Sequence, residues 1–525
     1  HLHGMGGKTN MGRMIRMSGY QLDDENTFEE PEKVRDRTVK MEGASKKFIY
    51  EAPAYSVSVL RLKKKQAFNP YLPSWEYIPD GEPYVFGDRV YVYGSHDFYN
   101  GHVFCLGDYV CWSAPVDNLA DWRYEGVIYP KTEDPLNRDG KMCLYAPDVT
   151  VGPDGRYYLY YVLDHVSVVS VAVSDTPAGK YEFYGYVKYS DGIAIGKKNE
   201  PFQFDPGIFM DDDGKLYLYT GFALAGNPIL LDGSKPTEHG PMCFELDPSD
   251  MLTVLNGPSY IGVAGEKESI GTPYEGHSFL EASSMRKFNG SYYFIYSTMN
   301  SHELCYATSD SPVKGFQYGG ILVSNGDVGL EGVPDVKHAR CNTGNTHGSI
   351  IELNGKYFVF YHRHSNRKQS SRQAMAEEIR FEDGKFYQAE MTSCGLNGGP
   401  MEGKGTYPSY IVCNLYGKKG TRFLSMIKHP KKDCPYLTQD GKDRESGPDQ
   451  YIANMCDGAL AGFKYFDLSE TKEISVTVKG HAEGTLYVRT SENGEAVATI
   501  AVSPCKELKE FSSAVQTSGN REALF

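Results

Sequence analysis

The chain of 525 residues is longer than one ordinary hydrophobic core allows, so we expect two or three domains. Its formal net charge of −14 excludes the basic footprint of a nucleic-acid-binding protein and favours a neutral or cationic partner. No apolar run approaches the length of a membrane-spanning helix, and no P-loop, dinucleotide-binding or GxSxG motif is present, so we expect neither a membrane protein nor an organic cofactor.

The eleven cysteines are scattered along the chain and show no CxxC or Cys/His zinc spacing. This distribution favours free thiols in a reducing compartment, so we expect a cytoplasmic rather than a secreted protein. The chain begins at His1 rather than at a methionine, and no signal peptide is visible. The expectation therefore leaves room for an export signal upstream of the sequence.

The first 66 residues differ in composition from the rest of the chain. Residues 21–37 are mostly polar or charged. The alternating segment YSVSVLRL at 55–62 has a clear strand pattern, and three lysines follow it. A segment of this kind buries little apolar surface by itself. We therefore expect residues 1–66 to be a partly disordered N-terminal extension, the remnant of a β-sandwich.

Five aromatic-rich strand patterns recur between residues 67 and 395. Each follows a tight-turn signal, such as Asn289-Gly290 or Asn354-Gly355, as the second strand of a β-hairpin does. A supersecondary unit used five times is typical of radial β architecture. We therefore predict an all-β protein in which residues 67–395 form a five-bladed β-propeller. The five patterns lie at 90–95, 157–162, 216–221, 292–297 and 357–362.

An acidic residue or a histidine stands nine to eleven positions before each aromatic pattern. If the five units close around an axis, these equivalent positions meet at one mouth of a central channel. Bringing carboxylates of like charge together is costly, so such a cluster indicates a functional site. The five residues are Asp80, Asp148, Asp205, Glu281 and His347.

A second β pattern starts after a Gly-, Pro- and Lys-rich stretch near residue 395. Alternating segments such as KEISVTVKG (472–480) and GTLYVRTS (484–491) predict half-buried strands of a β-sandwich over residues 405–525. The pattern stops one or two strands before such a sandwich would close. We therefore expect an incomplete sandwich domain with an open edge.

Five segments, in this order, resemble glycoside hydrolase family 43. The resemblance covers about residues 68–390. Residues 405–525 are similar to a truncated family 6-type carbohydrate-binding module, and NTFEEPEKV with PAYSVSVLRL near the N-terminus resembles the C-terminal end of a family 51 arabinofuranosidase. The five family 43 segments are NPYLPSWEYIPDGEP from 69, LYAPDVTVGPDG from 144, FDPGIFMDDDG from 204, FLEASSMRK from 279 and GNTHGSIIELNG from 344.

The family 43 resemblance implies a catalytic pair of carboxyl groups. Asp80 in YIPDGEP matches the general base that activates water, and Glu281 in FLEASSMRK matches the general acid that protonates the departing oxygen. Asp148 in LYAPDVT matches the third carboxylate, which tunes the pKa of the acid and orients it. For Asp205 in FDPGIF we expect a structural hydrogen-bonding role. A turn-forming Asp80 and a solvated Glu281 at a strand edge are the alternatives.

The resemblance also implies residues that bind the sugar and a metal. Arg372 in SSRQAMAEEI matches the last-blade arginine that reaches the sugar and the catalytic carboxylates. His96, Asp97 and Arg363 are further candidates for substrate binding, because they follow strand patterns at the expected mouth of the channel. His347 in GNTHGSI resembles the axial histidine that holds a calcium ion coordinated largely by water. A histidine satisfied by hydrogen bonds without an ion is the alternative.

The activity implied is that of an inverting exo-glycosidase. We expect it to release terminal α-L-arabinofuranosyl residues from plant arabinan, arabinoxylan or derived oligosaccharides. A β-xylosidase acting on xylo-oligosaccharides is the close alternative, because both sugars fit this scaffold. A catalytically inactive carbohydrate-binding propeller is the alternative from another class, although binding alone would not require three carboxylates.

Overall fold

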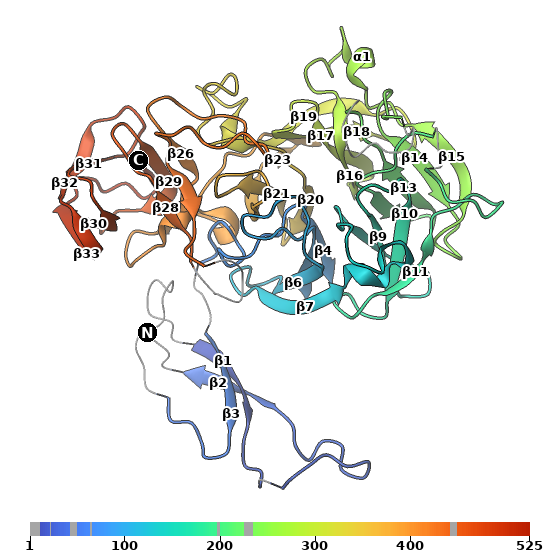
Figure 1. The fold of residues 1–525 in the computed structure, drawn as a ribbon, viewed down its shortest axis with the longest axis horizontal. Helices are drawn as coiled ribbons and strands as arrows, with labels where there is room; N and C mark the ends of the chain where they lie inside the picture. The colour runs from blue at the N-terminus through green and yellow to red at the C-terminus, as the bar shows by residue number, and fades with distance from the viewer. Residues whose placement is uncertain are drawn as a thin grey trace. The chain divides into compact units, whose positions relative to one another are not determined.

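The computed structural model describes residues 11–21, 23–42, 50–62, 66–196, 200–224, 235–441 and 449–525 (Figure 1). The parts of the predicted N-terminal extension at 1–10, 22, 43–49 and 63–65 lie outside the described residues. Within the described ranges the only α-helix is α1 (Glu266–Ser269), so the chain is all-β, as predicted. None of the helices described there is long and apolar enough to cross a membrane.

Contacts divide the chain into two compact units. Unit 1 comprises residues 1–68, 399–408 and 465–523, and unit 2 comprises residues 69–398, 409–464 and 524–525. Residues 409–464 thus group with the segment predicted to be the propeller. The domain division at 1–66, 67–395 and 405–525 stays a prediction.

Unit 1 contains two groups of strands. Near the N-terminus, β1 (Met11–Met17) pairs antiparallel with β2 (Arg37–Glu42) on one side and with β3 (Val57–Leu62) on the other. Near the C-terminus, β30 (Glu473–Gly480) pairs with β33 (Cys505–Ala514), and β31 (Gly484–Arg489) pairs with β32 (Ala496–Val502). The alternating patterns at 55–62, 472–480 and 484–491 are strands, as predicted.

Unit 2 contains five consecutive antiparallel sheets, each with its strands in chain order. The first holds β4 (Glu82–Phe86), β5 (Arg89–Tyr93), β6 (Tyr109–Pro115) and β7 (Arg123–Tyr129); the second β8 (Asp148–Val151), β9 (Tyr157–Val162), β10 (Val169–Ser174) and β11 (Glu182–Tyr186); the third β12 (Gly207–Met210), β13 (Leu216–Thr220), β14 (Met242–Leu246) and β15 (Val254–Tyr260); the fourth β16 (Phe279–Phe288), β17 (Ser291–Thr298), β18 (Glu303–Ser309) and β19 (Gln317–Ser324); the fifth β20 (Ser349–Leu353), β21 (Lys356–His364) and β22 (Arg372–Ile379).

Shorter elements fill the connections and the remainder of the chain. The five 3-10 helices described are η1 (Lys131–Glu133), η2 (Pro135–Asn137), η3 (Asn325–Asp327), η4 (Gly395–Asn397) and η5 (Ser409–Ile411). The remaining strands are β23 (Phe381–Glu382), β24 (Lys385–Phe386), β25 (Met401–Glu402), β26 (Asn414–Tyr416), β27 (Tyr436–Thr438), β28 (Tyr451–Ala453), β29 (Leu460–Asp467) and β34 (Glu522–Leu524).

The aromatic patterns form β5, β9, β13, β17 and β21, which is the second strand of each sheet, as predicted. Each of these strands has a hydrogen-bonded neighbour on both sides, and most of its aromatic side chains are buried. Aromatic residues favour strands, and tyrosine combines an apolar ring with a polar hydroxyl, so these residues suit the central strands of a sheet. The Asn289-Gly290 and Asn354-Gly355 turns have positive φ at both residues, as type I′ hairpins require.

The hydrophobic core of unit 2 lies between neighbouring sheets rather than in one central mass. One cluster joins the first and second sheets, a second the second and third, a third the third and fourth, and a fourth the fourth and fifth. Each sheet therefore packs face to face against the next sheet along the chain.

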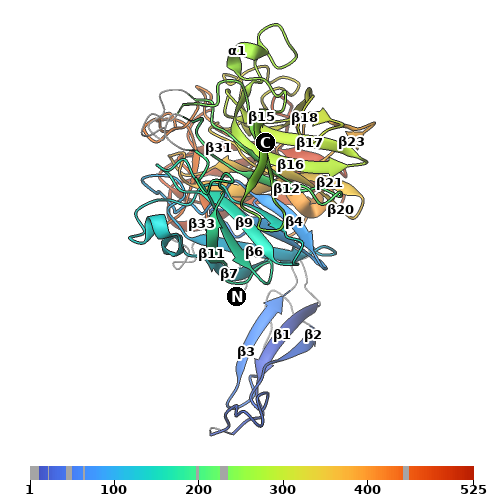
Figure 2. The same cartoon turned by 90° about the vertical axis from the view of Figure 1, so that its right-hand side faces the viewer.

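The first strands of the five sheets lie close to one another (Figure 2). Contacts join β8 to β12, β12 to β16, β16 to β20 and β20 to β4, and Gly81 forms a parallel bridge with Gly348. A Cβ at Gly348 would stand 1.9 Å from the carbonyl oxygen of Phe360, so only glycine lets the backbone of Phe360 approach position 348 this closely. Polar residues at the starts of neighbouring first strands are therefore brought near one another.

Candidate active site

Three ionisable side chains from different sheets meet at the starts of the first strands. Asp80 precedes β4, Asp205 precedes β12 and His347 precedes β20, and all three are buried. Nδ1 of His347 lies 3.5 Å from Oδ2 of Asp205 and 4.0 Å from Oδ1 of Asp80. The imidazole thus bridges two carboxylates that the sequence separates widely.

Arg372 contributes the positive charge next to Asp80. Its Nη1 donates to Oδ1 of Asp80 at 3.0 Å. Its Nε and Nη2 donate to the two oxygens of Asp97, at 2.8 and 3.0 Å. A bidentate pair of this kind fixes the plane of the guanidinium. Asp97 therefore holds Arg372, and Arg372 in turn holds Asp80.

Glu281 lies near the start of β16 and remains partly exposed. Burial, together with the charges of Asp205 and Asp80, raises the pKa of Glu281 to about 8, while His347 and Arg372 lower it. The carboxyl therefore retains its proton at neutral pH, as a general acid must. The charges of Asp80, Asp205 and His347 all affect the pKa of Glu281, so these four side chains form one electrostatic cluster.

The backbone is unusual at this cluster. Asp80 and Asp205 adopt positive φ values of 59° and 44°, and Ala282, directly after Glu281, has a φ of 69°. Non-glycine residues rarely occupy this left-handed region, and such residues concentrate at functional sites. Asp148 is not among the residues with positive φ. The backbone thus groups Asp205 with Asp80.

Asp148 belongs to a different hydrogen-bond network. Its Oδ1 accepts from the hydroxyl of Tyr84 at 2.5 Å, and its Oδ2 accepts from the backbone N–H of Ile208 at 2.8 Å. Burial and the charge of Glu82 raise the pKa of Asp148 to about 8, while Arg286 lowers it. Asp148 therefore joins β8 to β4 and to β12 through its hydrogen bonds.

A buried ion pair lies at the centre of this second network. Nη2 of Arg286 is 2.6 Å from Oε2 of Glu82, and Nη1 of Arg286 donates to the hydroxyl of Tyr84 at 3.1 Å. The hydroxyl of Ser284 also donates to Oε2 of Glu82, at 3.1 Å. These contacts connect β4 of the first sheet with β16 of the fourth, so they support the strands that carry the ionisable cluster.

Two further residues predicted to bind substrate have their polar atoms occupied elsewhere. The ring nitrogens of His96 lie 3.0 Å from Oε1 of Glu76 and 3.0 Å from the carbonyl oxygen of Asp108. Arg363 is buried and donates to Gln373 and to the carbonyl oxygens of Tyr410 and Val412. His96 and Arg363 therefore stabilise their surroundings, and their place in substrate binding stays a prediction.

His347 is the residue that could hold a cation. Although burial favours the neutral ring, the hydrogen bond and charge of Asp205 raise the pKa of His347 to about 9. A proton therefore supplies the positive charge between Asp205 and Asp80 at neutral pH. The carboxylate oxygens and the imidazole nitrogen form a donor set that fits a hard divalent cation completed by water, which would replace that proton.

The sequence contains signals for residues that the predicted catalytic set left out. Asp205 stands eleven positions before its aromatic pattern, the same offset as Glu281. His362 follows the last aromatic pattern, and its Nδ1 lies 3.4 Å from Oδ1 of Asp80 while its Nε2 lies 2.9 Å from the carbonyl oxygen of Asn345. Burial and the charge of Arg372 lower the pKa of His362 well below its ordinary value, so the ring is neutral.

Comparison with known proteins identifies the family of this chain and several of its relatives. The sequence model of glycosyl hydrolases family 43 matches residues 78–386. A xylosidase/arabinosidase of Thermoclostridium stercorarium is 53% identical over 88% of this chain and 96% of its own length. A β-xylosidase of Xylanibacter ruminicola is 30% identical over 55% of this chain and 88% of its own length. Among solved structures, that of RS223-β-xylosidase is 27% identical, covers 60% of this chain and 96% of its own, and has a TM-score of 0.47.

Proposed function

Since the chain belongs to glycosyl hydrolases family 43, and is thus a glycoside hydrolase, we propose that it is an inverting exo-glycosidase. Its substrate is the terminal α-L-arabinofuranosyl residue of plant arabinan, arabinoxylan or derived oligosaccharides. The five sheets of unit 2 are the blades of a five-bladed β-propeller in this proposal, and the substrate binds where their first strands begin. Membership of this family also argues against a catalytically inactive binding protein.

The observation that carries the proposal is the convergence of ionisable groups from separate sheets. His347 lies within 4.0 Å of both Asp80 and Asp205, and the charges of all three act on the pKa of Glu281. Carboxyl groups with different environments supply an acid and a base at the same pH. A purely structural role would not require such a costly gathering of charge.

In the proposed mechanism, Glu281 and Asp80 act on opposite sides of the scissile bond. Glu281 gives its proton to the glycosidic oxygen as the bond between that oxygen and the anomeric carbon breaks. Asp80 takes a proton from a water molecule whose oxygen forms the new bond to the anomeric carbon. Inverting enzymes hold the two carboxyl groups about 6.5–9.5 Å apart to admit this water. Arg372 keeps Asp80 oriented through its hydrogen bond to Oδ1.

We assign the tuning of the acid to Asp205 in place of Asp148. The charge of Asp205 raises the pKa of Glu281, and Asp205 shares His347 with Asp80. Asp148 instead bonds Tyr84 and the backbone of Ile208. Its role in the proposal is to hold the first strands together. A calcium ion at His347, when bound, would supply the positive charge that the imidazolium proton otherwise supplies.

Hydrolysis of terminal β-xylosyl residues is the second candidate function. The relative from Thermoclostridium stercorarium is named for both sugars, and the relative from Xylanibacter ruminicola is named for xylose alone. The arrangement of Asp80 and Glu281 serves either sugar, because the chemistry at the anomeric carbon is the same. The surrounding pocket decides between them.

The test compares arabinobiose and xylobiose as substrates for the wild type and two variants. We expect measurable kcat/KM on arabinobiose, reduced about 10²–10⁴-fold by Asp80→Asn and by Glu281→Gln. Glu268→Gln, a change on α1, serves as a matched control and should leave kcat/KM unchanged. A preference for xylobiose would establish the second candidate function. Full activity of both carboxyl variants would refute the assigned mechanism.

A further inference from the structure

The strand that carries Glu281 is irregular at that residue. Along β16, Phe279 pairs with Thr298, Glu281 with Ser297 and Ser284 with Ile295, so residues 279–284 of β16 span only residues 295–298 of β17. A bulge of this kind interrupts the ladder and redirects the side chain. The regular pairing of β16 and β17 therefore does not by itself fix where Glu281 points.

The segment immediately before this bulge is fastened to the turn between β17 and β18. Asn300 Nδ2 donates to the carbonyl oxygen of Gly276 at 2.6 Å, the hydroxyl of Tyr296 donates to that of His277 at 2.9 Å, and the N–H of Met299 donates to that of Ser278 at 3.0 Å. Three successive carbonyl groups are thus held by one hairpin. The start of β16 is positioned from this side.

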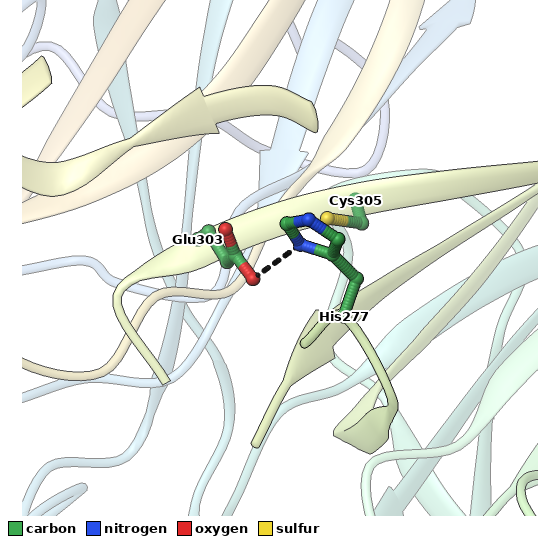
Figure 3. A group of neighbouring side chains, drawn as sticks. All are labelled: His277, Glu303 and Cys305. Carbon is green, nitrogen blue, oxygen red and sulfur yellow. Dashed lines mark hydrogen bonds and ion pairs between the residues drawn. The ribbon is translucent and has the colours of Figure 1, made fainter. Parts of the chain in front are cut away.

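Glu303 organises that attachment. Its Oε1 accepts hydrogen bonds from Nδ1 of His277 at 2.8 Å, from Nδ2 of Asn300 at 2.9 Å and from the hydroxyl of Thr298 at 2.7 Å. Glu303 is 3% exposed, whereas His277 is partly exposed. Figure 3 shows the imidazole of His277 reaching from its own segment to the carboxylate at the start of β18.

The side chains of His277, Glu303 and Cys305 lie close enough together to hold a metal ion. Hydrogen bonds already occupy His277 and Glu303, however. Burial and the charge of Glu303 raise the pKa of Cys305 well above its ordinary value, so its sulfur is a thiol. Despite burial, the hydrogen bonds from His277, Asn300 and Thr298 hold the pKa of Glu303 below its ordinary value. The ring of His277 also stacks on Tyr318 at 5.0 Å. The ionised carboxylate of Glu303 thus acts as the acceptor of these three hydrogen bonds.

We propose that Glu303 is a positioning residue for the general acid. Through His277 and Asn300 it holds residues 276–278, and so it sets the position of Glu281 three residues further along the chain. This inference rests on the proposed function of Glu281. A displacement of about 1 Å in a catalytic group can cost about 10²-fold in rate. The loss should be greatest for substrates whose leaving group most needs a proton.

The test varies the leaving group while keeping the sugar constant. One substrate is the disaccharide that the wild type cleaves, and the other is the 2,4-dinitrophenyl glycoside of the same sugar, whose phenolate departs without protonation. We expect Glu303→Gln to lower kcat on the disaccharide about 10–100-fold and to change kcat on the aryl glycoside less than about 5-fold, with KM unchanged for both.

A second variant and a control keep the test sharp. His277→Phe retains the ring that stacks on Tyr318 and removes the hydrogen bond to Glu303, so it should act in the same direction with a smaller effect. If Glu303→Gln does not fold, the same comparison is made with His277→Phe. Glu268→Gln removes the carboxylate from another His–Glu pair, Glu268 with His239, and should leave both substrates unaffected.

Two outcomes separate this inference from the proposed function. An equal loss on both substrates, or no loss on either, in a folded Glu303→Gln or His277→Phe variant would overturn the positioning role while leaving the function of Glu281 intact. Full activity of Glu281→Gln on the disaccharide would overturn the proposed function, and the positioning role with it.

Discussion

Charges of both signs surround the carboxyl group of Glu281, and their balance sets the pH range in which it can act. Burial and the carboxylates of Asp205 and Asp80 outweigh the opposing charges of His347 and Arg372. Because the pKa is raised, the protonated form persists from acidic to neutral pH. The proton is lost as the pH rises through about 8.

The first prediction concerns the alkaline limb of the pH profile. Because a general acid works only while protonated, we expect kcat on a disaccharide to fall as the pH rises through about 8. A pH–rate profile measured with an unactivated disaccharide checks this. A limb centred near the ordinary glutamate value of about 4.3 would contradict the account of Glu281.

The second prediction separates the two candidate third carboxylates. Asp205→Asn removes a negative charge that raises the pKa of Glu281, so the alkaline limb should move to lower pH by about one unit. Asp148→Asn should leave the limb in place, because the main charges that shift the pKa of Glu281 are those of Asp205, His347, Asp80 and Arg372. The same pH profile of both variants is the measurement. If Asp148→Asn shifted the alkaline limb and Asp205→Asn did not, Asp148 would be the residue that tunes the pKa of Glu281.

The repeat in the sequence predicts which residues converge but not what each does there. Asp148 and Asp205 stand at similar offsets before their aromatic patterns, so the spacing treats them alike. The structure distinguishes them by backbone conformation, since Asp205 adopts positive φ as Asp80 does. It also distinguishes them by partners, because Tyr84 occupies Asp148 while His347 faces Asp205. Neither difference leaves a signal in the local sequence.

At the scale of single elements, the bulge in β16 provides the third prediction. Ala282 is buried and has a φ of 69°, a conformation that costs an alanine roughly 1–2 kcal/mol and a glycine little. We expect Ala282→Gly to change the free energy of unfolding by less than about 1 kcal/mol, because relief of strain offsets the lost methyl group and the added chain entropy.

The matched control for Ala282 lies in the same sheet. Ala307 in β18 is equally buried but is not among the residues with positive φ, so Ala307→Gly should cost about 1–2 kcal/mol more than Ala282→Gly. Urea denaturation of both variants measures the difference. Equal losses would show that the backbone at Ala282 is not strained.

The fourth prediction concerns the ion pair between β4 and β16. Because Glu82 and Arg286 are both buried, removing one partner leaves an uncompensated charge, and Arg286→Met should cost about 3–5 kcal/mol of unfolding free energy. The exposed pair of Arg156 and Asp154 is the control, and Arg156→Met should cost less than about 1 kcal/mol. Denaturant titration compares the two. Similar small losses would mean that β4 and β16 do not depend on the pair.

Whole strands were easier to predict than their irregularities. The aromatic patterns became the second strands of five sheets, because alternation and turn residues such as Asn289-Gly290 specify a hairpin locally. The bulge at Glu281 was not predicted, since Ala282 has no preference for the conformation it adopts. Local sequence patterns also do not record the hydrogen bonds that Glu303 makes to the segment before the bulge and to the following turn.

At the scale of the molecule, the repeat predicted five consecutive sheets, and the structure has them. The grouping of residues 409–464 with those sheets was not predicted. That grouping rests on contacts distant in sequence, such as the bonds from Arg363 to the carbonyl oxygens of Tyr410 and Val412. Composition along the chain, from which the boundary near 395–405 was predicted, does not record such contacts.

The central claim is that Asp80 and Glu281, held by different sheets, act together on a glycosidic bond with water between them. A direct displacement by water inverts the anomeric carbon, whereas a covalent intermediate retains its configuration. Proton NMR of the first sugar released distinguishes the two before the product equilibrates in solution. We predict the inverted anomer, β-L-arabinofuranose from an α-L-arabinofuranoside or α-xylose from a β-xyloside. Release of the retained anomer would contradict the account.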